Sequence, residues 1–209
     1  MSYWPEFLTI VVAHALAVAS PGPDFALVLR QSLAHGRRVA VWASIGIGSG
    51  IAIHVAYCSL GLGLLLRDSP TALNIAKYLG AAYLAWVGVQ AIRAQPRDGD
   101  VDLTARDDAP TDGAAWLQGF IVNVLNPKAA LFFISLYALR VSPETPALLK
   151  LGYGAWLVVA TMAWFCLVSV LFTQTSVRRR FLRHGHWIDR ALGVVFIAFA
   201  VALVRAKLS

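Results

Sequence analysis

Long apolar segments alternate with short polar ones along almost the whole chain. The apolar runs reach the roughly 20 residues that a membrane-spanning helix needs. We expect six such segments, at about residues 5–33, 39–66, 70–93, 114–140, 147–175 and 187–206. The pattern therefore predicts an all-α integral membrane protein with six transmembrane helices.

The first apolar segment is interrupted by the stretch Ser20, Pro21, Gly22, Pro23 and Asp24. An α-helix does not continue through it, because each proline lacks an N–H group and clashes with the preceding turn. A break at membrane depth leaves backbone groups without partners, so it must be buried in protein or line a polar cavity. Discontinuous helices of this kind are the best indication in a sequence of a transporter's binding site.

The fourth segment is interrupted in the same way, at Asn126, Pro127 and Lys128. We expect each second half-helix to begin with a polar N-cap, Ser20 or Asn126. Proline then follows at the first helical position, where its missing N–H costs nothing. The sequence thus predicts that the first and fourth helices are both broken at proline motifs.

The two halves of the chain correspond. Pro21 and Pro127 are 106 residues apart, and the third spans also match, with residues 79–86 resembling residues 192–199 at an offset of 113. An odd number of spans per half gives the halves opposite orientations. We therefore expect two inverted three-helix repeats, residues 1–94 and 114–209. An acidic linker, residues 95–113, joins them within one membrane domain.

Basic residues set the expected orientation, because cytoplasmic loops are enriched in Lys and Arg. Eleven lie in one set of loops and span ends, and six in the opposite set. The larger set is Arg30, Arg37, Arg38, Arg93, Arg97, Arg106, Arg178, Arg179, Arg180, Arg183 and Arg190. The bias predicts both termini on the outside of the membrane.

Composition agrees with a membrane protein: 58% of the 209 residues are hydrophobic and 14% are charged. Mean hydropathy is +0.66. The net charge of +7 comes from residues at span ends, so the expected partner is a lipid bilayer and not nucleic acid. Cys58 and Cys166 lie in apolar segments without a CxxC motif, and we interpret them as small buried hydrophobic residues. No metal or cofactor is expected.

Ionisable groups within the spans are candidates for function, since charge is costly in a bilayer. Asp24 lies in the first turn of a half-helix, where it either caps the helix or binds an ammonium group or a proton. The free N–H groups of that turn suit a carboxylate. Lys128 is either a carboxylate partner, a snorkelling side chain or a structural pair for Asp24. Asn123 can hydrogen-bond either to substrate or to backbone groups that the break leaves without partners.

In the second span Gly46, Gly50, His54 and Cys58 recur every four residues and share one helix face. Gly46 and Gly50 form a small-residue packing motif, so His54 is expected to face the protein. A histidine there either carries protons, because it titrates near neutral pH, or forms structural hydrogen bonds. His14 has no supporting pattern.

These motifs resemble the LysE/RhtB family of bacterial amino-acid exporters. The resemblance rests on the first break, on Gly36, on residues 78–84 and on residues 119–129, and the span pattern agrees along the chain. It implies an inner-membrane exporter driven by the proton gradient, with Pro21, Gly22, Pro23, Asn126, Pro127 and Lys128 as its functional core. His14 is not part of this pattern.

The sequence therefore predicts a secondary transporter, not an enzyme, that exports a small amino acid in exchange for protons. The expected binding residues are Ser20, Pro21, Gly22, Pro23, Asp24, Asn123, Asn126, Pro127 and Lys128, with Asp24 and His54 as candidates for proton coupling. The alternatives are an exporter of another small metabolite, an intramembrane enzyme using Ser44, Ser49 or His54, and a channel or scaffold. Small residues on many helices suit packing within one chain or in a homo-oligomer.

Overall fold

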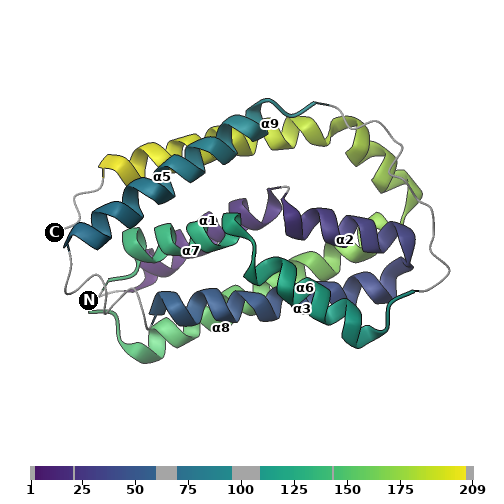
Figure 1. The fold of residues 1–209 in the computed structure, drawn as a ribbon, viewed down its shortest axis with the longest axis horizontal. Helices are drawn as coiled ribbons and strands as arrows, with labels where there is room; N and C mark the ends of the chain where they lie inside the picture. The colour runs from purple at the N-terminus through teal and green to yellow at the C-terminus, as the bar shows by residue number, and fades with distance from the viewer. Residues whose placement is uncertain (1–2, 21, 60–69, 96–108, 143, 206–209) are drawn as a thin grey trace.

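The computed structural model describes residues 3–20, 22–59, 70–95, 109–142 and 144–205, and all of their regular secondary structure is helical (Figure 1). The helices are α1 (Trp4–Ala19), α2 (Pro23–Ala34), α3 (Gly36–Tyr57), α5 (Pro70–Ile92), α6 (Asp112–Val124), α7 (Pro127–Arg140), α8 (Ala147–Phe172) and α9 (Thr175–Arg205).

Membrane-spanning helices are recognisable within the described residues. By length and composition, α3 and α8 can each cross a bilayer alone. The pairs α1–α2 and α6–α7 are bent by 52° and 56°, and each qualifies as one broken span. The prediction of a helical membrane protein is thus supported by up to four spans. The count of six and the inverted repeat stay predictions.

One stretch that was predicted to be a loop is helical. The basic residues 178–183 were expected in a loop before a span at 187–206, yet α9 already begins at Thr175 and includes them. Arginine, leucine and phenylalanine are all compatible with a helix, and no proline interrupts this stretch. Polarity alone therefore does not end the helix. Residues 60–66 and most of the acidic linker, residues 96–108, lie outside the described residues.

The helices form three layers in Figure 1, with the broken ones mainly in the middle layer. Helices α5 and α9 lie side by side along one edge, and α3 packs on both α6 and α8 along the other. The half-helices α1, α2 and α7 lie between these edges, so both breaks fall near the centre of the molecule.

Glycines allow the helices of each edge layer to approach closely. A Cβ atom at Gly46 or Gly119 would lie 2.0 Å from a backbone carbonyl oxygen of the other helix, on Trp116 and Ala43 respectively. Small residues at such crossings are typical of helix packing in membranes. This close approach of α3 and α6 positions the second break.

The contacts of α3 with α8 and of α5 with α9 are nearly reciprocal. Gly48 faces Met162, and Gly154, which lies 106 residues after Gly48, faces Val55. In the other pair, a Cβ at Gly88 would lie 2.9 Å from the Gly193 carbonyl oxygen, and the reverse distance is 2.7 Å. In each pair, therefore, both helices contribute a glycine to the interface.

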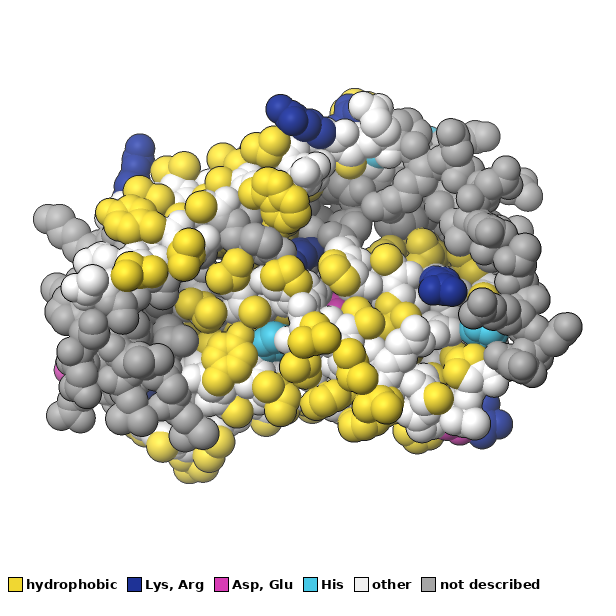
Figure 2. Space-filling view, viewed as in Figure 1, with side chains coloured by type: hydrophobic (Ala, Val, Ile, Leu, Met, Phe, Trp, Pro, Cys, Tyr) yellow, Lys and Arg dark blue, Asp and Glu magenta, His cyan; other side chains and the backbone are white. Residues whose placement is uncertain are grey.

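Hydrophobic side chains also cover the exterior. Figure 2 shows them spread across the middle of one face. Large exposed examples on four helices are Trp86, Ile121, Val159 and Val201. Exposed apolar surface on long helices suits lipid contact. Cys58 is 2% exposed within a core cluster, as expected for a small buried hydrophobic residue, and Cys166 is half-buried; both are free thiols.

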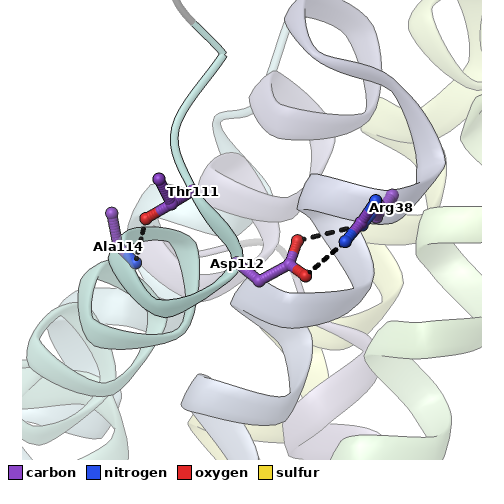
Figure 3. A network of polar contacts seen from close by, with 4 residues as sticks. All are labelled: Arg38, Thr111, Asp112 and Ala114. Atoms are coloured by element: carbon purple, nitrogen blue, oxygen red, sulfur yellow. Dashed lines mark hydrogen bonds and ion pairs between the residues drawn. The ribbon is translucent and has the colours of Figure 1, made fainter.

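Polar contacts tie the start of α6 to α3 (Figure 3). The Thr111 hydroxyl accepts a hydrogen bond from the Ala114 N–H and caps α6, while Arg38 donates to both carboxylate oxygens of Asp112 at 3.1 and 2.8 Å. The Arg38 side chain is 81% exposed. Exposed ion pairs contribute little to stability, so this contact orients the end of the linker more than it stabilises the fold.

Candidate functional site

The half-helix that follows each break, α2 or α7, has a different kind of N-cap. Asn126 is the N-cap of α7, as predicted, and its Oδ1 accepts a hydrogen bond from the Lys128 N–H at 3.0 Å. The predicted N-cap role of Ser20 is wrong, because α2 begins at Pro23 and its cap is Gly22. Pro23 also suits a first helical position, and it forces the preceding residue into an extended conformation. Pro21 lies outside the described residues.

Asp24 joins the two breaks. Its Oδ2 accepts hydrogen bonds from the side-chain amides of Asn123, at 2.9 Å, and Asn126, at 3.0 Å. Its other oxygen, Oδ1, is buried and has no hydrogen-bond partner among the described residues. A buried carboxylate oxygen without a partner is costly, so this atom is available for a ligand that donates hydrogen bonds.

Lys128 reaches from the second break back to the first. Its Nζ donates to the Ser20 carbonyl oxygen at 2.7 Å and lies 5.4 Å from the centre of the Phe196 ring. A Cβ at Gly22 would lie 3.2 Å from the Lys128 Cδ. The side chain therefore extends across the break, rather than snorkelling toward an interface.

A cavity of about 50 Å³ lies between the breaks. This volume accommodates a few water molecules. Four of the predicted residues supply polar groups to its wall: Ser20, Asp24, Asn126 and Lys128. The remaining wall is largely apolar and includes Ile51, Phe132, Phe133 and Phe165. The cavity wall does not include Pro23, Asn123 or Pro127, but Asn123 holds Asp24 on that wall through a hydrogen bond.

Asn123 depends on the glycine face of α3. It is fully buried, and a Cβ at Gly50 would lie 2.6 Å from its Oδ1. Gly50 was predicted to be a packing residue. Because it has no side chain, it leaves the space that Asn123 needs to reach Asp24.

His54 lies behind Asn123. Its Nε2 is 3.0 Å from the Asn123 carbonyl oxygen, and its Nδ1 is 2.9 Å from the Tyr57 hydroxyl. The ring stacks on Phe133 at 5.6 Å. Both ring nitrogens thus have protein partners and the side chain is not on the cavity wall, an arrangement that favours the structural interpretation of His54.

The sequence did not predict two polar residues of the cavity wall, His14 and Thr161. His14 Nε2 lies 2.9 Å from Thr161 Oγ1. They are 147 residues apart, and no motif marks either one. A usable signal existed for His14, which shares a helix face with Ile10 and Ala17, both buried in α1.

Comparison with known proteins agrees with this architecture. The family described as LysE type translocator matches residues 15–207. This chain belongs to the LysE family. The resemblance inferred from the break motifs is thereby confirmed, and the chain is a multi-pass membrane protein of a transporter family.

Curated relatives match over nearly their full length. The threonine efflux protein of Escherichia coli K12 is 31% identical over 202 residues, covering 96% of this chain and 98% of that protein. The leucine efflux protein of Klebsiella pneumoniae is 28% identical, covering 97% and 96%. The homoserine/homoserine lactone efflux protein of Salmonella typhimurium is 28% identical, covering 98% and 97%. No solved structure matches the chain.

Proposed function

We propose that this protein is a secondary transporter that exports amino acids across the bacterial inner membrane. The observation that carries the proposal is the meeting of Asp24, Asn126 and Lys128 at one central cavity between two broken helices. The names of the relatives support amino acids as the cargo, because these relatives include efflux proteins for threonine, leucine and homoserine.

The cavity offers groups for both charges of an amino acid. The Oδ1 atom of Asp24, which lacks a partner among the described residues, suits the ammonium group. Lys128 Nζ and the N–H groups at the start of α2 and α7 suit the carboxylate, because helix N-termini attract anions. Ser20, Gly22 and Pro23 shape the first break, and Asn123 and Pro127 shape the second.

Transport requires the cavity to open. At about 50 Å³ it is too small for an amino acid together with its water. We infer that the repeats 1–94 and 114–209 rock around the site, as in other transporters built from inverted repeats. The shared offset of 106 residues, between the breaks and between Gly48 and Gly154, supports this inference.

Of the two candidates for proton coupling, Asp24 is favoured. Its carboxylate is on the cavity wall, so a proton and a substrate ammonium would compete for it. That competition is the simplest basis for exchanging one amino acid for a proton. His54 already has protein partners on both ring nitrogens.

The alternative of an intramembrane enzyme has less support. Ser44 contacts the Ala40 carbonyl oxygen and Ser169, while Ser49 donates to Ile45 and contacts Trp116. Neither hydroxyl is paired with His54 in the described part of the chain. The same cavity is compatible with an exporter of another small metabolite. The identity of the transported molecule distinguishes that alternative from an amino-acid exporter.

Exchange in proteoliposomes tests the proposal. Vesicles would be preloaded with unlabelled amino acids, and uptake of labelled threonine, homoserine, leucine and lysine would be followed with and without a pH gradient. We expect saturable exchange that the gradient accelerates. Absence of exchange of every amino acid by folded protein would reject the amino-acid cargo, and a chemically altered substrate would indicate an enzyme.

A further inference from the structure

A second cavity lies between the N-terminal ends of α1 and α8. It is a groove of about 370 Å³, and its wall includes five aromatic side chains: Tyr3, Trp4, Phe7, Tyr153 and Trp156. The positions of the basic residues predict that both helices begin on the outside of the membrane. The aromatic groove is therefore expected on the side to which an exporter releases its cargo.

The aromatic groove and the central cavity lie along the same pair of helices. We propose that the groove is the external vestibule of the export path, which the amino acid occupies after it leaves the central cavity. The contact between Trp156 and His14 is the barrier between the two. This inference rests on the proposed function and adds a path and a gate to it.

The two cavities meet at one pair of rings. Trp156 lines the aromatic groove and His14 lines the central cavity, and their rings meet edge-on with centroids 5.5 Å apart. The imidazole is also held from the cavity side, because His14 Nε2 lies 2.9 Å from Thr161 Oγ1. Thr161 lines the central cavity as well. The hydrogen bond thus keeps the His14 ring at the boundary between the cavities.

Ring contacts join α1 to α8 along the whole of this seam. Phe7 stacks on Tyr153 with centroids 5.5 Å apart and meets Trp156 edge-on at 5.7 Å. Helices α1 and α8 belong to different predicted repeats, so rocking of the repeats would act on these contacts. Side-chain rotamers change faster than helices move. The seam can therefore open at its rings, while the α3–α6 crossing keeps backbone against backbone.

The chemistry of the groove suits a site that holds cargo weakly. Aromatic faces attract an ammonium group, but only modestly where water has access. Trp4 is 62% exposed, so water reaches at least this part of the groove. An export path must release what it carries. A weak aromatic site at its outer end would accept the amino acid from the central cavity without retaining it.

Modification of the groove tests whether cargo passes through it. Leu149 lines the groove and is 36% exposed, while its neighbour Leu148 is 79% exposed and is not on the groove wall. Leu149→Cys and Leu148→Cys would be treated in detergent with a trimethylammonium methanethiosulfonate and then reconstituted. We expect the treatment to block amino-acid exchange by Leu149→Cys, relative to the same variant untreated. The matched control, Leu148→Cys, should exchange equally well with and without treatment.

Access to the central cavity tests the barrier. Ala17 lines that cavity and is 9% exposed, so Ala17→Cys reports entry of the same reagent, which does not cross membranes. In right-side-out vesicles we expect Trp156→Ala to raise the labelling rate at least about tenfold, because the ring contact is lost. Trp156→Leu is a second variant that keeps an apolar side chain. Trp4→Ala, the same change elsewhere on the groove, should keep the original rate. Protein without Ala17→Cys gives the background from Cys58 and Cys166.

Each outcome decides the inference. Treated Leu149→Cys that exchanges as fast as the untreated variant would overturn the vestibule. An unchanged labelling rate in both Trp156 variants would overturn the barrier, as would an equal rise in Trp4→Ala. A rise that is seen only in inside-out vesicles would overturn the external position of the groove. Labelling needs no cargo, so a rate that depends on Trp156, without exchange of any amino acid, would support the barrier and reject the proposed function alone.

Discussion

Asn123 connects three helices through its own atoms. Its Nδ2 donates to Asp24 on α2, its Oδ1 faces Gly50 on α3, and its carbonyl oxygen contacts His54 and the Asn126 N–H at the end of α6. Buried polar atoms are expensive unless they are paired. The position of Asp24 therefore depends on residues that never line the cavity.

Replacement of Gly50 by alanine tests this dependence. The added Cβ would lie 2.6 Å from Asn123 Oδ1 and displace the amide from Asp24. We expect exchange by Gly50→Ala to fall by at least about tenfold, the equivalent of losing one charge-assisted hydrogen bond. Gly152→Ala is the control on α8, because a Cβ there has nothing within 4 Å. Equal exchange rates in the two variants would contradict the role of Gly50.

Replacement of Asp24 by asparagine tests proton coupling. The amide keeps the shape of the side chain but cannot take up a proton or pair with an ammonium group. We expect Asp24→Asn to lose stimulation by a pH gradient and to reduce exchange by about 100-fold. His54→Gln is the comparison, and it should retain gradient stimulation of whatever exchange remains. Gradient stimulation that survives in Asp24→Asn but not in His54→Gln would assign coupling to His54.

At the scale of elements, the breaks and the glycine crossings act together. The α6–α7 bend of 56° places Asn126 beside Asp24 only because α6 lies directly against α3. Gly46 and Gly119 allow this contact, since each faces a backbone carbonyl oxygen of the other helix. Proline thus breaks the helix, while glycine determines where the broken ends lie.

Enlargement of a crossing glycine should destabilise the fold. A Cβ at Gly119 would lie 2.0 Å from the Ala43 carbonyl oxygen, so the backbones must separate. We expect Gly119→Ala to cost about 1–3 kcal/mol, as overpacking does, and to lower the melting temperature in detergent by several degrees. Gly113→Ala in the first turn of the same helix has open space around its Cβ and should leave that temperature unchanged or raise it. A Gly119→Ala variant as stable as wild type would contradict the tight α3–α6 crossing.

At the scale of the whole molecule, the two halves form one continuous unit. Helix α3 of the first half packs on α6 and α8 of the second, and α5 packs on α9. The cavity itself takes residues from both halves, including Asp24 and Lys128. Movement of one half against the other would therefore change the cavity directly.

Reporter fusions test the predicted orientation. The excess of basic residues on one side predicts that both termini are outside the cytoplasm. Alkaline phosphatase fused to the C-terminus should then be active, and green fluorescent protein at the same site should be dark. Fusions within the linker at residue 100 should give the reverse pattern. The opposite pair of results would show that the basic residues do not determine the orientation.

The sequence predicted a helical membrane protein and several of the residues that the structure brings together at the candidate site, because several signals were local. Asn126 followed by proline identified a helix cap that the structure contains, and the glycine face of α3 identified the helix surface that packs on α6. The cap of α2 was predicted wrongly, because two prolines in succession offer two possible starts. The start of α9 was missed because arginine is compatible with both a loop and a helix.

The sequence alone was enough to predict long apolar helices and the two points where they break. Length, hydropathy and the missing N–H of proline are properties of a short stretch of chain. Which polar groups contact one another depends on the packing of the helices. Asp24 contacts amides 99 and 102 residues away, and His14 contacts a threonine 147 residues away. Such contacts depend on how whole helices cross, and no local pattern in either segment encodes that crossing.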